Sequence, residues 1–330
     1  MTSTGMRLSL LHLATVGRDQ PVGEALEASV TLAQKADSLG AFERLWFAEH
    51  HNMSSIASAA TAVLLAHVAA RTERIRVGSG GVMLPNHSPL VIAEQFGTLA
   101  ELHPDRIDLG LGRAPGTDQV TMRALRVDPR ASDRFPEDVL ELRGYLSDET
   151  LVPTIHAIPG RGTRVPLYIL GSSLFGAQLA ARLGLPYAFA SHFAPDALQQ
   201  AVEAYRREFR ASEQLAEPYV IAALNVVVAD EQERAEALAA SVLRSRVRSL
   251  ASRVPAYAGR LDDATVEALM DSPVAAQARH MMTYTAVGDV AAVKDYLERF
   301  GQHAQADELM VTNAAPGLAN RLRALELLAS

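Results

Sequence analysis

Apolar runs and helical periodicities alternate along almost the whole chain. Short apolar stretches recur about eight times, at 7–14, 44–51, 75–84, 106–112, 166–171, 187–193, 219–228 and 308–313. Between them lie segments with apolar residues three or four positions apart, the period of amphipathic helices, as at 23–39, 55–71, 89–102, 174–183 and 318–328. Strands that alternate with helices favour a parallel sheet. Since no break in composition divides residues 1–330, we predict one domain with a (β/α)8 TIM-barrel fold.

The pattern loosens after the seventh expected strand. Residues 230–285 are mostly helical by their spacing and carry the basic cluster RSRVRS at 244–249. This segment predicts a helical insertion between strands seven and eight. One interpretation is an additional pair of packing or dimer helices.

A cation follows the fourth expected strand. The segment RIDLGLGRAPG, residues 106–116, passes through Gly110 and Gly112 and places Arg113 in a turn that contains Pro115. Glycines let a ligand approach the backbone, and arginine binds phosphate or carboxylate with two parallel hydrogen bonds. The arrangement suits an anionic cofactor, although a strand that ends in Gly-Arg is also ordinary sheet architecture.

Two hydroxyls follow the fifth expected strand. Ser172 and Ser173 come directly before a helix that begins near Leu174. Hydroxyls and free backbone amides at a helix N-terminus bind phosphate, and a serine here is also a common helix cap. If strands four and five are neighbours, these serines and Arg113 converge on one site.

Alternation along the second expected strand decides which side chains share a face. Trp46 and His50 fall on one face, and Phe47 and Glu49 on the other. Because Phe47 suits the helix-covered outside, His50 is expected to point into the barrel mouth. Adjacent histidines on a strand cannot both face one centre, so His50 and His51 are poor ligands for a shared metal, and no metal site is predicted.

Composition then excludes several classes of protein. The 330 residues include 31 Lys and Arg against 38 Asp and Glu, a formal net charge of −7, which argues against binding to nucleic acid or an anionic membrane. The chain has no cysteine, which removes disulfides, thiolate metal sites and cysteine nucleophiles. The apolar stretches are too short for a membrane span or a signal peptide, so we expect a cytoplasmic protein.

Three segments of the chain resemble the signature regions of the bacterial luciferase-like flavin monooxygenases. They are VGSGGVMLPNHSPLVIAEQFGTLAELHPDRIDLGLGRAPG at 77–116, WFAEHH at 46–51 and YILGSSLFGAQLAARLGLPYAFASHF at 168–193. The resemblance implies that a separate NAD(P)H:flavin reductase supplies reduced FMN. This protein would then react the flavin with O2, through a C4a-(hydro)peroxyflavin, to oxygenate a small organic substrate. It also implies a homodimer, and a mobile lid formed by residues 230–285.

The same resemblance assigns roles to individual residues. His50 is the expected acid–base catalyst, because its ordinary pKa of about 6.5 allows both roles near neutral pH. The flavin ring is expected to lie on Ser79, Gly80 and Gly81, commonly joined in the family by a non-proline cis peptide. Its phosphate would bind Arg113 and the helix start at Ser172, Ser173, Leu174 and Gly176, where Gly176 replaces the usual serine and offers only its amide. Residues near the mouth that could contact the substrate are His12, Glu49, His51, Ser191 and His192.

Three alternative functions stay open. The first is an F420-dependent oxidoreductase of the same superfamily, and the second is a non-catalytic protein that binds or stores flavin. The third is a metal-dependent barrel hydrolase that uses Glu49, His51, His12 and a further carboxylate. An NAD-binding domain is not supported, because no expected strand is followed by the glycine fingerprint GxGxxG with an acidic residue about 20 positions later.

Overall fold

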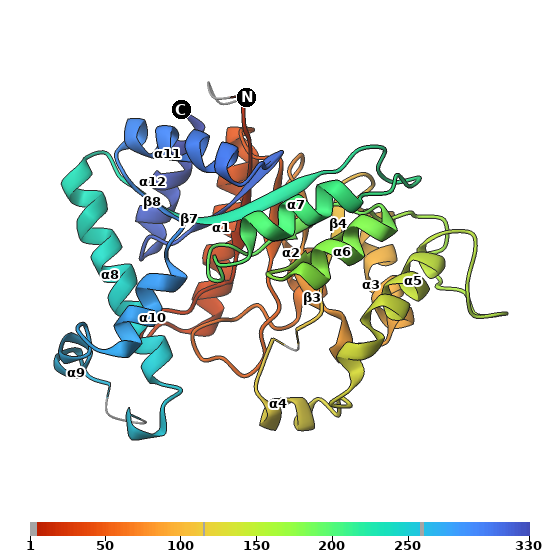
Figure 1. Cartoon of the computed structure of the whole chain (residues 1–330), viewed down its shortest axis with the longest axis horizontal. Coiled ribbons are helices and arrows are strands. Elements are labelled where there is room, and N and C mark those ends of the chain that lie inside the picture. Colours follow the sequence, from red (N-terminus) through yellow and green to blue (C-terminus); the bar gives the residue numbers. More distant parts are fainter. Residues whose placement is uncertain (1–4, 115, 258–260) are drawn as a thin grey trace.

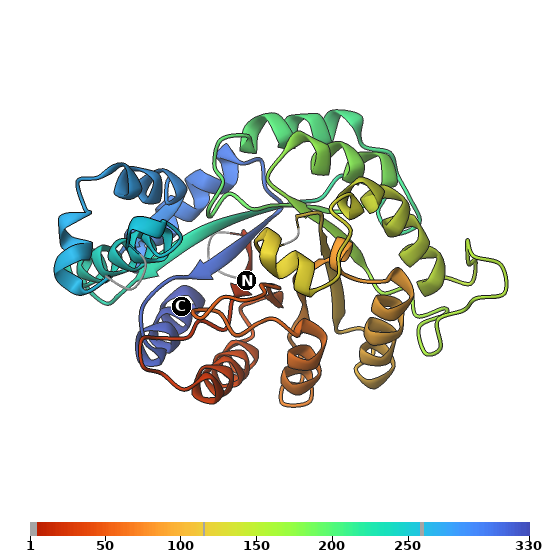
Figure 2. The same ribbon diagram turned by 90° about the horizontal axis from the view of Figure 1, so that it is seen from below.

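The chain forms a closed barrel of eight parallel strands, as the sequence predicts. The computed structural model describes residues 5–114, 116–257 and 261–330, and therefore does not include Pro115 of the turn after the fourth strand. The barrel runs in the order β6-β5-β4-β3-β2-β1-β9-β7 and closes where β7 pairs with β6 (Figure 2). Its strands are β1 (Arg7–His12), β2 (Arg44–Phe47), β3 (Arg76–Met83), β4 (Ile107–Gly112), β5 (Leu167–Gly171), β6 (Tyr187–Phe189), β7 (Val220–Val228) and β9 (Glu308–Asn313).

Helices surround the barrel (Figures 1 and 2). They are α1 (Val22–Leu39), α2 (Thr61–Ala69), α3 (Pro89–Leu102), α4 (Gln119–Ala124), α5 (Phe135–Leu146), α6 (Leu174–Leu183), α7 (Leu198–Glu208), α11 (Val290–His303) and α12 (Leu318–Ala329), with short 3-10 turns η1 (Leu84–Asn86), η2 (Ala131–Arg134) and η3 (Pro255–Tyr257). The helix expected from residue 55 begins only at Thr61, because Ser58 uses its carbonyl to accept the backbone N–H of His50. None of the described helices is long and apolar enough to cross a membrane.

The predicted insertion lies between β7 and β9. It contains α8 (Gln232–Ala251), α9 (Asp263–Ala268) and α10 (Pro273–Met281), which Figure 1 shows grouped on one side of the molecule. Small and aliphatic side chains of these helices form their own apolar cluster, which includes Val247, Val266 and Ala275. The sequence pattern did not predict β8 (Thr285–Gly288), a short strand that pairs with the end of β7 outside the barrel.

A buried ionic network closes the barrel at the amino ends of its strands. Arg44 donates two hydrogen bonds to Glu308, at 2.9 and 3.1 Å, and a third to Asp108 at 2.8 Å. Both carboxylates are fully buried, and Tyr168 and Tyr219 bind the same network. Burial lowers the pKa of the Arg44 guanidinium, but the two carboxylates outweigh burial and raise it. This end of the barrel is therefore fixed by satisfied charges, which leaves the opposite end for a ligand.

Candidate active site

A cavity of about 690 Å³ opens at the carboxyl ends of the strands, where barrels of this kind place their ligand sites. Its walls include eight of the residues predicted from the sequence: His50, Gly80, Gly81, Arg113, Ser172, Ser173, Gly176 and His192. Six other predicted residues do not line it: His12, Glu49, His51, Ser79, Leu174 and Ser191. The structure thereby separates the predicted residues that a ligand in the cavity can touch from those that do not line it.

Arg113 and the start of α6 form the polar end of the cavity. Because β4 and β5 are neighbours, Arg113 and Ser172 line the same wall. The guanidinium lies over the ring of Phe175, 4.2 Å from its centroid, and its Nε donates to the carbonyl of Ser132 at 3.2 Å. Ser173 occupies the cap position of α6, but its side chain makes no capping hydrogen bond. This end therefore offers a cation, free hydroxyls and helix amides to an anion such as phosphate.

Two glycines of β3, Gly80 and Gly81, form the floor of the cavity. The peptide bond between Gly80 and Gly81 is cis. A Cβ on Gly80 would lie 2.8 Å from Leu11 Cδ1, and one on Gly81 would lie 2.8 Å from the carbonyl oxygen of Gly110. Ser79 lies behind this floor, where its hydroxyl donates to the same carbonyl at 2.8 Å. Backbone is therefore presented directly to the cavity, as a flat ring requires for close approach.

His50 faces the cavity together with Trp46, as the alternation of side chains along β2 predicts. Its Nδ1 lies 3.4 Å from the carbonyl oxygen of Gly116, and its backbone N–H is held by Ser58. Burial lowers the pKa of the His50 imidazole below its ordinary value, and the positive charge of Arg253 acts in the same direction. The ring is therefore neutral at neutral pH and available to accept a proton.

Two residues expected near the substrate lie elsewhere. His12 points toward α1, where its Nε2 lies 2.9 Å from the hydroxyl of Ser29, and burial lowers its pKa to about 3. Its neighbour Leu11 takes the inward position on β1, because alternate side chains face opposite sides of a strand. Ser191 is fully buried and donates to the carbonyl of Ala223 at 2.5 Å. Both side chains hold elements of the barrel together.

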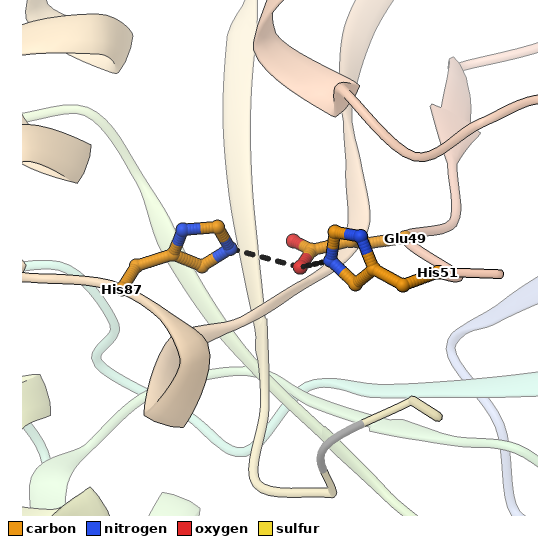
Figure 3. Close-up of side chains that lie close together, drawn as sticks. All are labelled: Glu49, His51 and His87. Carbon is orange, nitrogen blue, oxygen red and sulfur yellow. Dashed lines mark hydrogen bonds and ion pairs between the residues drawn. The ribbon is translucent and has the colours of Figure 1, made fainter. Parts of the chain in front are cut away.

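Glu49 and His51 belong to a cluster behind the cavity wall, completed by His87. Figure 3 shows both rings pointing toward one carboxylate oxygen of Glu49, from which each Nε2 lies 2.8 Å away. The other oxygen accepts the backbone N–H of Met83 at 3.1 Å. Burial raises the pKa of Glu49, but the hydrogen bonds from both histidines and from Met83 outweigh burial and hold it below its usual value.

This cluster has the residue types of a metal site, with ligand atoms within 4.8 Å of one another. None of its three side chains lines the cavity. His12, which the hydrolase alternative requires, lies at α1 instead. The arrangement therefore ties the end of β2 to η1 and does not support a hydrolytic centre in the cavity.

The sequence predicts the insertion as a lid, but none of the insertion residues that line the cavity was among the predicted site residues. Arg246, Ser249 and Arg253, at or after the end of α8, line its wall together with Met281. Arg246 and Ser249 lie within the basic cluster at 244–249, which indicates positive charge but does not show which of its side chains face the cavity. No aspartate or glutamate is among the described residues that line the cavity. The charged side chains among the described lining residues are therefore all cations.

Comparison with known proteins agrees with this geometry. A sequence model of luciferase-like monooxygenases matches residues 6–311. The chain is 44% identical over 331 residues to a luciferase-like monooxygenase of Escherichia coli strain K12, covering 99% of this chain and 97% of that protein. It is 35% identical to apo-MsnO8, whose crystal structure matches with a TM-score of 0.86 over 98% of this chain and 96% of that one.

More distant structures share the fold. The oxygenating constituent of 3,6-diketocamphane monooxygenase from the CAM plasmid of Pseudomonas putida, solved in complex with FMN, matches with a TM-score of 0.75 at 16% identity, over 98% of this chain and 97% of that one. F420-dependent enzymes also share the fold, at 16% identity. The family match over nearly the whole chain and the 44% identity decide the classification. The chain therefore belongs to the luciferase-like monooxygenase family and is an enzyme.

Proposed function

We propose that this chain is the oxygenating component of a two-component system. It binds reduced FMN, which a separate NAD(P)H:flavin reductase supplies, and uses O2 to oxygenate a small organic substrate. The observation that carries the proposal is the joint presence, in one cavity, of an anion-binding end at Arg113 and Ser172 and a backbone floor at Gly80 and Gly81. An FMN molecule needs both, because it joins a phosphate to a flat ring.

Each part of FMN has a matching group of residues in the cavity. Arg113 and the amides at the start of α6 would hold the phosphate, and Gly80 and Gly81 would support the ring. Apolar side chains from β1, β2, β7 and β9 line the rest of the chamber and would help to exclude water once a flavin is bound. Bound FMN would supply the electrons that activate oxygen. His50 is the group placed to accept or return a proton at its imidazole nitrogen.

Replacing Arg113 by alanine is expected to weaken the binding of reduced FMN by about 1.5–3 kcal/mol, the range for hydrogen bonds to charged groups. The physical reason is loss of the cation at the phosphate end. Anaerobic fluorescence or calorimetric titration with reduced FMN measures the dissociation constant. Exposed Arg130 on the neighbouring loop provides the control, since an Arg130→Ala variant should bind FMN as the unaltered chain does. Equal binding by Arg113→Ala would contradict the phosphate assignment.

The identity of the cofactor has a specific alternative, F420. Because F420-dependent enzymes have this fold, titration with reduced F420 under the same conditions separates the two cofactors. Tight binding of FMN with no effect on its reaction with oxygen would instead support a flavin-storage protein.

The assembly belongs to the same proposal. We propose that the protein is a homodimer. We also propose that it works in the cytoplasm, because the reductase that supplies it draws its electrons from NAD(P)H. The insertion is proposed to act as a lid over the cavity, since α8 and α10 already contribute to its wall. Light scattering after size exclusion measures the oligomeric state.

A further inference from the structure

The basic cluster on α8 divides into paired and unpaired arginines. Arg244 donates to Glu267 at 3.0 Å, and Arg248 donates to Asp263 at 2.5 Å, so both bind carboxylates of the insertion. Arg246 lies between them in sequence but faces the cavity, and it has no ion pair or side-chain hydrogen bond among the described residues. Burial lowers the pKa of Arg246, and no carboxylate offsets this effect. The helix therefore holds a partly buried cation that no carboxylate in the described part of the chain neutralises.

This cation comes from a different element of the fold than the anion-binding end assigned to FMN. Arg113 lies on the loop after β4, against Phe175 at the start of α6. Arg246 comes from the insertion, and its charge acts on His192, which follows β6. The insertion thus adds a second cation to the cavity, and no carboxylate among the described lining residues compensates for its charge. Arg253 adds a further positive charge on the side of His50.

His192 supplies a hydrogen-bonding group in the same cavity, within electrostatic range of Arg246. Its side chain is 9% exposed and lines the cavity, and its Nδ1 is buried with no hydrogen-bond partner in the described structure. Burial, Arg246 and His50 lower the pKa of His192 to about 3, so the ring is neutral at neutral pH. Asn225 fixes this segment by donating to the carbonyl of His192 at 2.7 Å. Because Nδ1 is enclosed and Nε2 has no hydrogen-bond partner among the described residues, Nε2 is the ring nitrogen that a ligand in the cavity can reach.

We propose that Arg246 and His192 form a subsite for the anionic group of the organic substrate, a carboxylate or an equivalent oxyanion. The apolar body of that substrate lies along Ile221 and Met310, which line the same chamber. Arg246 provides the charge, and the neutral imidazole donates its N–H to a second oxygen of the anion. The inference rests on the function proposed above and names its substrate class, an amphiphilic organic anion.

Occupation of the subsite by the cofactor itself is the main competing explanation, because reduced flavin also carries negative charge. The two explanations differ in what Arg246 affects. If Arg246 serves the substrate, its removal leaves FMN binding unchanged and changes only the binding of an organic anion. If it serves the flavin, its removal weakens FMN binding as strongly as removal of Arg113 does.

The test uses the full chain saturated with reduced FMN under anaerobic conditions, so that the phosphate end is filled. Calorimetric titration compares octanoate with octan-1-ol, which has the same chain length and no charge. We expect the unaltered protein to bind octanoate at least about tenfold more tightly, as hydrogen bonds to a charged group predict. Arg246→Gln should remove most of this preference, and Arg246→Lys should retain part of it. Arg244→Gln, on the exposed face of the same helix, should retain all of it.

Three results would overturn the proposal. They are the absence of any preference for octanoate in the unaltered protein, an undiminished preference in Arg246→Gln, and a loss of FMN binding in Arg246→Gln equal to that in Arg113→Ala. If reduced FMN fails to bind the unaltered chain, the proposed function is contradicted instead. The comparison of octanoate with octan-1-ol is then made on Arg113→Ala without flavin, so that the subsite is judged separately.

Discussion

Replacing His50 by alanine lowers the rate of substrate oxygenation by an expected 10²- to 10⁴-fold, the usual contribution of a positioned acid–base group. His50 is the titratable side chain that β2 directs into the cavity, and its backbone is fixed by Ser58. The dissociation constant of reduced FMN should change little, because the phosphate end lies elsewhere. Product formation in a reductase-coupled assay measures the rate, with exposed His156→Ala as the control. Full turnover by His50→Ala with normal FMN binding would remove His50 from the mechanism.

The acidity of His50 predicts how this activity depends on pH. Burial holds the pKa of its imidazole below the ordinary value, so the neutral form that accepts a proton persists through neutral pH. As pH falls through that lowered pKa, the ring becomes protonated and kcat/KM should decline. The acid limb of the kcat/KM profile should therefore have its midpoint below about 6.5. A midpoint above that value would contradict the neutral state inferred from the structure.

Replacing Arg44 by methionine should destabilise the fold by about 3–5 kcal/mol, because it leaves Asp108 and Glu308 buried without their shared cation. Arg76 still reaches Asp108, but the donors left to Glu308 among the described residues are the hydroxyls of Ser9 and Tyr219. Urea denaturation followed by circular dichroism measures the loss.

Two variants make the Arg44 result interpretable. Arg44→Lys keeps the charge but not the two parallel hydrogen bonds to Glu308, so its loss should be smaller. Arg299→Met breaks an exposed helical ion pair with Asp295 and should cost less than about 1 kcal/mol. If Arg44→Met costs no more than Arg299→Met, the network does not stabilise the barrel.

The sequence predicts the features of this molecule that depend on the order of apolar and polar residues within one strand or helix. Alternation along a strand placed Trp46 and His50 on the inward face, and parallel strands brought Arg113 and Ser172 to one edge. The barrel also follows from pattern, because each strand and helix carries its own periodicity. Expectations failed where a tertiary contact overrides local preference. His12 is directed by its place on β1 to the helix side, and residues 55–60 form a loop that binds the end of β2.

The unpredicted parts depend on residues far apart in the chain. Arg44 and Glu308 are 264 positions apart, and Glu49 and His87 are 38 apart, so no local spacing links either pair. Arg246 stood within a visible basic cluster, but neither the cluster nor its spacing says which arginine faces the barrel. That is decided by how α8 packs against the rest of the insertion. The strand β8 has only four residues and no pattern that separates it from a loop.

The most direct test of the account is anaerobic titration of the protein with reduced FMN, followed by rapid mixing with oxygenated buffer. The absorbance of oxidised flavin reports the reaction, and free reduced FMN at the same concentration provides the reference. The account predicts saturable binding of reduced FMN and a delayed return of oxidised flavin compared with the free cofactor. Absence of FMN binding, with tight binding of reduced F420 in the parallel titration, would contradict it.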